Sequence, residues 1–438
     1  MQTLEKTKKY YFYTKDNSNL LLNYLFIPYV FFLPLTGPTS TVFFLMLALF
    51  FIRGNIKRHI TAALSNKVIF AFFLLFVLSV LWLLGTDDLT NISVEMKRMK
   101  VFLFPIVFIS FLKPEFIPKA IIAFMLGMLA SEITSYSIFF HVIEPIFYKN
   151  YAEFDPSPFM HHSEYGLILS LSAGILFYRL IAYKDELYLR ITTLLFFITI
   201  TVNIFITGGR MGYVLYGVSL FIVLAMYKVK LYKIILITVL LSVTVFSLAY
   251  QFSPLFQKRF QHSVNAINKL STDHPFNSSF GVRLGFMYYA TPVIKNNLLF
   301  GVGTGDHTQA VYDEIKIQNT DTFLLKITHF HNAHLVILVQ FGLLGLFIWL
   351  NVFYQSLRFK QTDHFMRTLV ILSTVLLFFY SFMSSVFKTQ IAEIFAVLIT
   401  LSLIHLKTDQ FKNVVFSKNE LLFYALSIPV FIAIKTVS

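Results

Sequence analysis

The sequence predicts an all-α membrane protein that crosses the bilayer about twelve times. Of its 438 residues, 57% are hydrophobic and 13% are charged, whereas a soluble domain carries about 25% charged residues. Runs of roughly 17 to 20 apolar residues recur along most of the chain, and each can span a hydrocarbon core about 30 Å thick. A soluble fold is therefore excluded, and a polytopic helical bundle is expected.

Hydropathy divides the chain into three parts. An N-terminal bundle (1–250) holds spans at 20–36, 41–52, 68–84, 101–112, 120–141, 164–178, 191–207, 211–227 and 234–250. A large outside loop (251–332) follows, and a C-terminal part (333–438) holds spans at 333–356, 368–386 and 391–406. Whether the short apolar run 420–434 also spans is left open.

Lysine and arginine are concentrated in the segments that lie inside when the N-terminus is inside. This asymmetry predicts the orientation, because cytoplasmic loops carry the excess of cations. The net charge of +14 is therefore a topology signal, and nucleic acid is not an expected partner, since no soluble domain is present to carry a basic face.

The basic segment 1–19 is expected at the cytoplasmic interface, and we predict no removable signal peptide. The chain has no cysteine, which excludes disulfides, thiolate metal sites and thiol catalysis.

Two short outside loops carry polar groups with several interpretations. The loop 85–100 ends with Lys97, Arg98 and Lys100, which suit lipid phosphates or an anionic substrate. The loop 142–163 leads into His161-His162-Ser163-Glu164. Adjacent residues on a helix point about 100° apart, so they are poor metal co-ligands. A polar cavity lining and a simple interfacial loop are the other interpretations.

A glycine-flanked arginine opens the span at 211–227. Gly208-Gly209-Arg210 combines backbone that a ligand can approach closely with a planar fork of donors suited to phosphate oxygens. The alternative is an arginine that only anchors a helix end at the interface. The glycines favour phosphate binding.

The large outside loop contains a second glycine-flanked arginine, Arg283, at the start of an expected amphipathic helix. The apolar residues recur at helical spacing; they are Val282, Phe286, Ala290, Val293 and Ile294. The following Gly301-x-Gly303-x-Gly305 lacks the Gly-Lys-Ser/Thr of a P-loop and the preceding strand of a dinucleotide fold. We interpret it as a flexible turn. The inside loops are too short for a nucleotide-binding domain, so ATP hydrolysis by this chain is not expected.

Three histidines precede the span at 333–356, namely His329, His331 and His334. His331 and His334 are three apart and would share a face if both were helical. Histidine titrates near neutral pH and suits a general base, and an arginine pair suits a diphosphate. A base and a diphosphate clamp on the outer side predict a transferase that uses an activated lipid diphosphate.

The residues at these positions resemble the O-antigen ligase and O-antigen polymerase superfamily of bacterial inner-membrane glycosyltransferases. The resemblance covers about residues 200–350. It rests on His331-Asn332 followed by Gly342-x-x-Gly345, on Gly209-Arg210, on Arg283, and on the stretch 299–305. Departures are Gly209, where the family usually has serine, and Asn297, where it often has proline.

The resemblance implies a GT-C-like helical fold with a large periplasmic loop, placed in the bacterial inner (cytoplasmic) membrane. It implies metal-independent transfer, without cofactor, of a glycan from undecaprenyl diphosphate to a lipid A-core hydroxyl at the periplasmic face. His331 would be the base, and Arg210 and Arg283 would bind the diphosphate. Asn332 would orient His331 or cap the helix, and His334 would support the site.

Alternatives remain open at the sequence level. His331 could be a structural interfacial histidine, and the string of three histidines could be a metal cluster. A repeat-unit polymerase of the same superfamily would use the same donor. A transporter built on the histidines would need acidic residues inside the bundle, where Glu132 and Glu393 are nearly alone.

Overall fold

The computed structural model describes residues 18–35, 39–86, 92–145, 155–227, 229–252, 256–258, 260–261, 264–265, 276–318, 323–384, 386–387 and 389–406. Over these ranges the secondary structure is helical and contains no strand, which confirms the all-α class. Nearly all of the basic N-terminal segment and the apolar run 420–434 lie outside the described residues.

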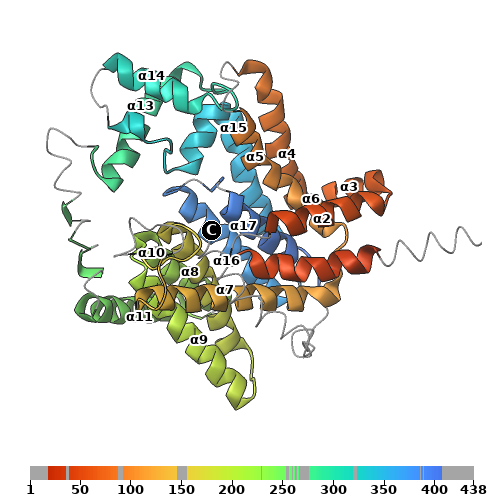
Figure 1. The fold of residues 1–438 in the computed structure, drawn as a ribbon, viewed down its shortest axis with the longest axis vertical. Helices are drawn as coiled ribbons and strands as arrows, with labels where there is room; N and C mark the ends of the chain where they lie inside the picture. Colours follow the sequence, from red (N-terminus) through yellow and green to blue (C-terminus); the bar gives the residue numbers. More distant parts are fainter. Residues whose placement is uncertain are drawn as a thin grey trace, which may run out of the picture.

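Figure 1 shows the helices, coloured in the order of the sequence. After a first helix at Ser18–Phe32, the α-helices are α2 (Thr39–Ile52), α3 (Ile56–Leu64), α4 (Lys67–Leu81), α5 (Ile92–Met99), α6 (Phe104–Ile109), α7 (Ile117–Phe139), α8 (His162–Ala182), α9 (Leu187–Ile206), α10 (Arg210–Met226), α11 (Leu231–Phe252), α13 (Ser279–Asn296), α14 (His307–Gln318), α15 (Ala333–Arg358), α16 (His364–Ser381) and α17 (Thr389–Ser402). Short 3-10 helices lie at Trp82–Gly85, Lys100–Leu103, Pro114–Phe116 and Leu324–Lys326.

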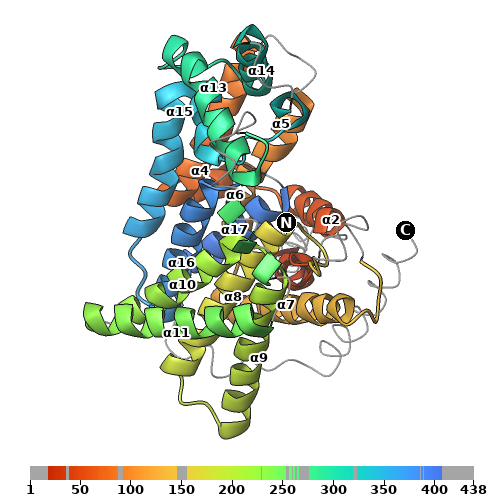
Figure 2. The ribbon, with the colours of Figure 1, turned by 90° about the vertical axis from the view of Figure 1, so that its left-hand side faces the viewer.

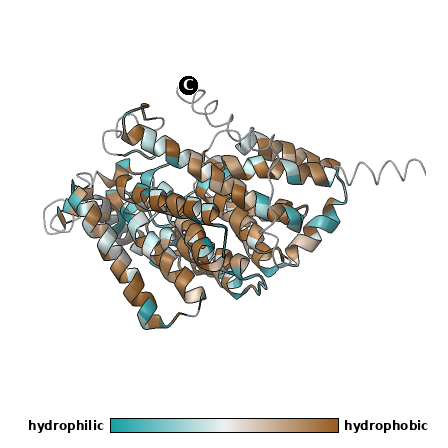
Figure 3. Ribbon diagram, turned by 90° about the horizontal axis from the view of Figure 1, so that it is seen from below, coloured by the Kyte–Doolittle hydropathy of each residue, from teal (hydrophilic) through white to brown (hydrophobic). Residues whose placement is uncertain are grey.

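Six helical segments in the described part of the chain are long and apolar enough to cross a bilayer, which makes this a multi-pass membrane protein. They are Lys67–Gly85, Pro114–Phe139, His162–Ala182, Leu187–Ile206, Ala333–Arg358 and His364–Ser381, and each coincides with a predicted span. The pair α2 and α3, bent by 112°, passes the same test together. Shorter apolar helices at Ser18–Phe32, Arg210–Met226, Leu231–Leu240 and Gln390–Ser402 account for further predicted spans. Figure 3 shows the mostly hydrophobic helices, with hydrophilic residues gathered near their ends.

The predicted span 101–112 is not one continuous helix. A 3-10 turn at Lys100–Leu103 precedes α6, which starts with Pro105 in its first turn and ends at Ile109. Six residues rise only about 9 Å, so α6 is too short to cross a bilayer. It is instead a core element, because Phe104 stacks on Phe43 of α2 with ring centroids 3.9 Å apart.

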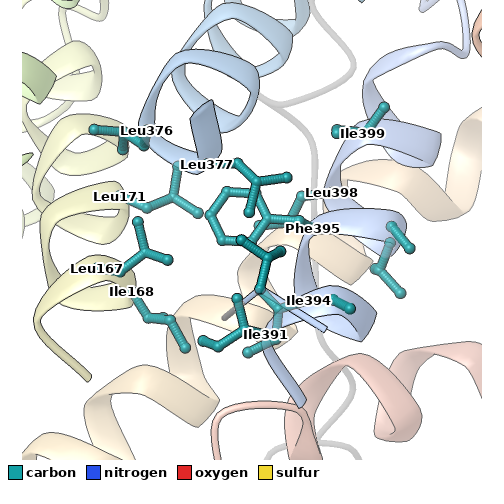
Figure 4. Packing of buried hydrophobic residues seen from close by; sticks show 14 of the residues in the cluster. Leu167, Ile168, Leu171, Leu376, Leu377, Ile391, Ile394, Phe395, Leu398 and Ile399 are labelled. Atoms are coloured by element: carbon teal, nitrogen blue, oxygen red, sulfur yellow. The ribbon is translucent and has the colours of Figure 1, made fainter. Parts of the chain in front are cut away.

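The centre of the bundle is formed by α8, α16 and α17. Leu167 and Leu171 of α8 meet Leu377 of α16 and Phe395 of α17 in a dry cluster (Figure 4). All four side chains are buried. This packing fixes the starts of α8 and α17 relative to the end of α16.

Two helices outside the six long spans lie together at one end of the molecule. α13 and α14 pack on each other and on α15, and α5 lies at the same end (Figures 1 and 2). The predicted helix in the outside loop is present as α13, and it buries Val282 and Phe286. Its opposite side is also apolar, since Met287 and Tyr288 are exposed.

Candidate functional site

A break in α15 sets the position of its first half. Gly342 has φ 63° and ψ −158° in the middle of the helix. The N–H groups of Val302 and Gly303 donate to the carbonyls of Val339 (3.0 Å) and Gln340 (3.1 Å), which would otherwise lack partners at the break. The N–H of Leu343 in turn donates to the Leu298 carbonyl at 2.8 Å.

The glycines allow the two backbones to touch. A Cβ on Gly301 would lie 2.4 Å from the Gln340 carbonyl carbon, and one on Gly342 would lie 2.4 Å from the carbonyl carbon of Leu299. The glycine-rich stretch is thus docked into the α15 break, and the turn is held by hydrogen bonds where a flexible one was expected. Gly301, from the stretch 299–305, and Gly342, from the Gly342-x-x-Gly345 motif, therefore both belong to this junction.

The start of α15 presents His331 outside the helix. Asn332 is the N-cap, and its Oδ1 accepts the Leu335 N–H at 3.0 Å, as capping asparagines do. His331 precedes the cap with φ 52°, a left-handed conformation that is uncommon for non-glycine residues. The neighbouring Phe330 is buried and stacks on Phe286 of α13, with ring centroids 4.6 Å apart. His331 is therefore held between a helix cap and a buried ring.

The predicted helical face shared by His331 and His334 does not form, because α15 begins only at Ala333. His334 points into the bundle and is 8% exposed. Its Nδ1 accepts the Trp349 Nε1–H at 3.0 Å, and its Nε2 lies 3.4 Å from the Phe378 carbonyl of α16. His334 therefore connects the start of α15 to the end of α16, whereas His331 lies before the helix and outside this buried contact.

The starts of α8 and α10 lie side by side. A Cβ on Gly209 would lie 2.7 Å from the carbonyl oxygen of His162, and a Cβ on Gly166 would lie 3.0 Å from the Gly212 Cα. The Ser170 hydroxyl donates to the Gly212 carbonyl at 3.0 Å. Arg210 is the first residue of α10 and is exposed. The small residues thus bring two helix N-termini together beside Arg210.

Arg283 joins this group from α13. Its Nε and Nη2 donate to the Met383 carbonyl, at 3.3 and 3.0 Å, just after the end of α16. Burial lowers the pKa of Arg283, and the nearby charge of Arg210 lowers it further, whereas Tyr380 raises it. The two predicted arginines therefore lie within electrostatic reach of each other, although they are far apart in the sequence.

His331 is linked to Arg283 through the aromatic stack. Arg283 lies one helical turn before Phe286, and His331 follows Phe330, the ring on which Phe286 stacks. The nearby ends of α10, α13 and α15 are all N-termini, which carry partial positive charge. Such an arrangement can bind an anion and can offer an imidazole beside it.

A buried polar network lies behind the α15 break. The Gln340 amide Nε2 is 2.6 Å from Nδ1 of His307 and 3.5 Å from Oε2 of Glu95. Glu95 also pairs with Arg98, so this cation of the loop 85–100 has a partner within the protein. Burial is the main cause that lowers the pKa of His307 to about 4. The charges of Glu95 and Asp306 raise this pKa, whereas those of Arg98 and His329 lower it. His307 is thus neutral at physiological pH.

An aspartate–histidine pair lies at the start of α8. Nδ1 of His162 is 2.8 Å from Oδ2 of Asp155, and Oδ1 of Asp155 accepts the Ser157 N–H at 3.1 Å. The sequence analysis considered His161 and His162 but did not predict that His162 pairs with Asp155. The only signal for this pair was that a single short, turn-rich segment separates Asp155 from His162. It also missed His307 and Gln340, because neither lies in a motif. Within the described ranges, no three histidine, aspartate or glutamate side chains are grouped as a metal would require.

In a comparison with protein families, residues 194–350 match a family model described as O-antigen ligase. The matched region contains α10, α13, α14 and the first part of α15, together with Arg210, Arg283 and His331. Comparison with curated proteins gives no match.

Proposed function

We propose that this chain, whose residues 194–350 match a family model described as O-antigen ligase, transfers a glycan from undecaprenyl diphosphate to a hydroxyl of lipid A-core. The proposed location is the bacterial inner membrane, with the site facing the periplasm. The charge asymmetry of the loops supports this orientation. In this topology 1–250 and 333–438 are the membrane parts, and 251–332 is a periplasmic loop that supplies Arg283.

The observation that carries the proposal is the proximity of Arg210 and Arg283. Burial lowers the pKa of Arg283 most, and the charge of Arg210 lowers it further, so the two like charges are unfavourable together. An anion bound between them relieves this repulsion. A diphosphate fits best, since guanidinium groups donate in pairs to phosphate oxygens, and the N-terminus of α10 adds N–H groups at the same place.

Transfer then needs a proton acceptor for the hydroxyl of the acceptor, and we assign this role to His331. The imidazole takes the hydroxyl proton while the acceptor oxygen forms a bond to the anomeric carbon. The bond from that carbon to the phosphate oxygen breaks, and its electron pair stays on the departing diphosphate. Arg210 and Arg283 stabilise this new charge. The diphosphate leaving group supplies the driving force, so ATP is not required.

The decisive experiment is transfer of a glycan from undecaprenyl diphosphate to purified lipid A-core by the purified protein. Wild type should transfer, and His331→Ala should not, although it should be folded and inserted. His364→Gln is the matched control, because His364 lies at the opposite end of α16, where it contacts Tyr178 and Met226. Full activity of His331→Ala would overturn the base assignment, and strict dependence of transfer on a metal that EDTA removes would overturn the metal-independent mechanism.

A polymerase of the same superfamily shares the donor and the site chemistry, and differs in its acceptor. Deletion of the gene separates the two. Loss of a ligase leaves long glycan on undecaprenyl diphosphate, whereas loss of a polymerase leaves lipopolysaccharide with a single repeat unit. The second phenotype would replace the ligase by the polymerase and leave the site unchanged.

A further inference from the structure

The start of α8 holds a histidine that is oriented as reactive histidines are. Asp155 is buried, and the Ser157 N–H fixes its Oδ1 at 3.1 Å, so its Oδ2 faces Nδ1 of His162 at 2.8 Å. A carboxylate acceptor keeps the imidazole proton on Nδ1 and leaves Nε2 as the open nitrogen. The His162 side chain is 23% exposed, so a ligand can reach it.

His162 lies directly against the start of α10. Its Cδ2, the ring atom bonded to Nε2, would be 3.7 Å from a Cβ on Gly209, and its carbonyl oxygen would be only 2.7 Å away. Any side chain at 209 would push the two helix starts apart. Gly209 therefore brings His162 next to Arg210, the residue that follows it.

The charged groups around His162 come from three elements. His161 is the N-cap of α8 and Glu164 lies in its first turn, and the His161 ring is 3.8 Å from the His162 ring, centroid to centroid. Arg210 lies on α10. Arg283 lies on α13 and donates to the Met383 carbonyl just after α16.

We propose that His162, oriented by Asp155, is a third contact of the donor diphosphate beside Arg210 and Arg283, and that it takes up a proton when the diphosphate binds. This inference rests on the proposed function. In the free protein Nδ1–H donates to Asp155 and Nε2 is bare. On binding, a proton given up by the buffer acid joins Nε2, which then donates to a phosphate oxygen, and the imidazolium lies between two anions. His162 is thus a binding group of the leaving diphosphate, distinct from the base at His331.

Calorimetric titration of the purified full-length protein with undecaprenyl diphosphate tests the proposal. Titrations at about pH 7.5 in two buffers of different ionisation enthalpy give the protons taken up per ligand bound. Wild type should take up more protons than His162→Gln, and Asp155→Asn should lose most of this difference. The dissociation constant of His162→Gln should rise about tenfold, as expected for one charge-assisted hydrogen bond.

His364→Gln is the matched control, because it makes the same substitution in the first turn of α16, far from the site, and should retain wild-type proton uptake. His331→Ala should also retain it. Equal uptake by wild type and His162→Gln, or a loss confined to His331→Ala, overturns the inference. Failure of the proposed function looks different, since wild type would then not bind the diphosphate, or Arg210→Ala would bind it as tightly as wild type. Thermal unfolding of each variant shows whether it is folded.

Discussion

The indole of Trp349 donates a hydrogen bond to Nδ1 of His334 across 3.0 Å, between the two halves of α15 that the break at Gly342 separates. Because Nδ1 accepts, the imidazole proton must reside on Nε2, which faces the Phe378 carbonyl at 3.4 Å. Both nitrogens of His334 are therefore used within the protein. The role of His334 is to hold the start of α15, and thereby His331, against the end of α16.

We expect Trp349→Phe to destabilise the protein without abolishing transfer. The substitution leaves buried Nδ1 of His334 without its donor, which costs about 1–3 kcal/mol. Thermal unfolding in detergent should show a lowered Tm, while transfer per folded molecule falls only a few-fold. Phe347→Leu on the same helix is the control, since Phe347 is 72% exposed. An unchanged Tm for Trp349→Phe would show that the hydrogen bond does not hold this junction.

His331→Gly should separate stability from activity. His331 has φ 52°, a conformation that costs an L-residue roughly 1–2 kcal/mol and glycine almost nothing. The variant should therefore unfold at the same temperature as wild type or slightly higher, and should have no transfer activity. His141→Gly makes the same change at φ 57° and should gain stability with full activity. Retained transfer by His331→Gly would contradict the proposed base.

Gly342→Ala should prevent the docking of the glycine-rich stretch into α15. A Cβ at 342 would lie 2.4 Å from the Leu299 carbonyl carbon, and the residue has φ 63°, so both backbone contact and conformation oppose alanine. We expect little folded protein after purification and a Tm lowered by many degrees. Gly85→Ala is the matched control, because a Cβ at position 85 would have no atom within 4 Å apart from its chain neighbours. A normally folded Gly342→Ala would mean that the two segments can separate.

Hydropathy predicted most of the spans because length and apolarity act locally. It failed at 101–112, where Pro105 and the 3-10 turn shorten the helix. The chemistry of Arg210 and Arg283 predicted that they would act together, and the charge of Arg210 does lower the pKa of Arg283, while their role in binding a diphosphate stays a prediction. The position of His331 was not, because helical spacing from His334 holds only if the helix starts before 331, and Asn332 caps it later. The α15 break depends on hydrogen bonds to residues 298–303, and such a distant partner is invisible in local sequence.

Removal of either arginine should weaken use of the donor more than use of the acceptor. Arg210→Ala or Arg283→Ala removes charge-assisted hydrogen bonds worth about 1.5–3 kcal/mol each, so the KM for the lipid diphosphate should rise roughly 10- to 100-fold. The KM for lipid A-core should change little. Lys295→Ala, at the exposed end of α13, is the control for a lost cation. Equal effects on both substrates would count against a diphosphate site.

Acid should destabilise the protein through His307. Its pKa is about 4 in the folded protein and about 6.5 when exposed in the unfolded chain, so the fold favours the neutral imidazole. This contribution is fully present above about pH 6.5 and is lost as the pH falls toward 4, because protons then bind the unfolded state more tightly. The difference corresponds to about 3 kcal/mol.

His307→Gln tests this dependence on pH, since its amide oxygen can still accept from Gln340 but does not titrate. Measured between pH 7 and 4, the Tm of wild type should fall more steeply than that of His307→Gln. His364→Gln should follow wild type, because His364 lies at the other end of the bundle. If wild type and His307→Gln lose stability in parallel, another group carries the acid sensitivity, and the network of Gln340 and Glu95 does not depend on a neutral His307.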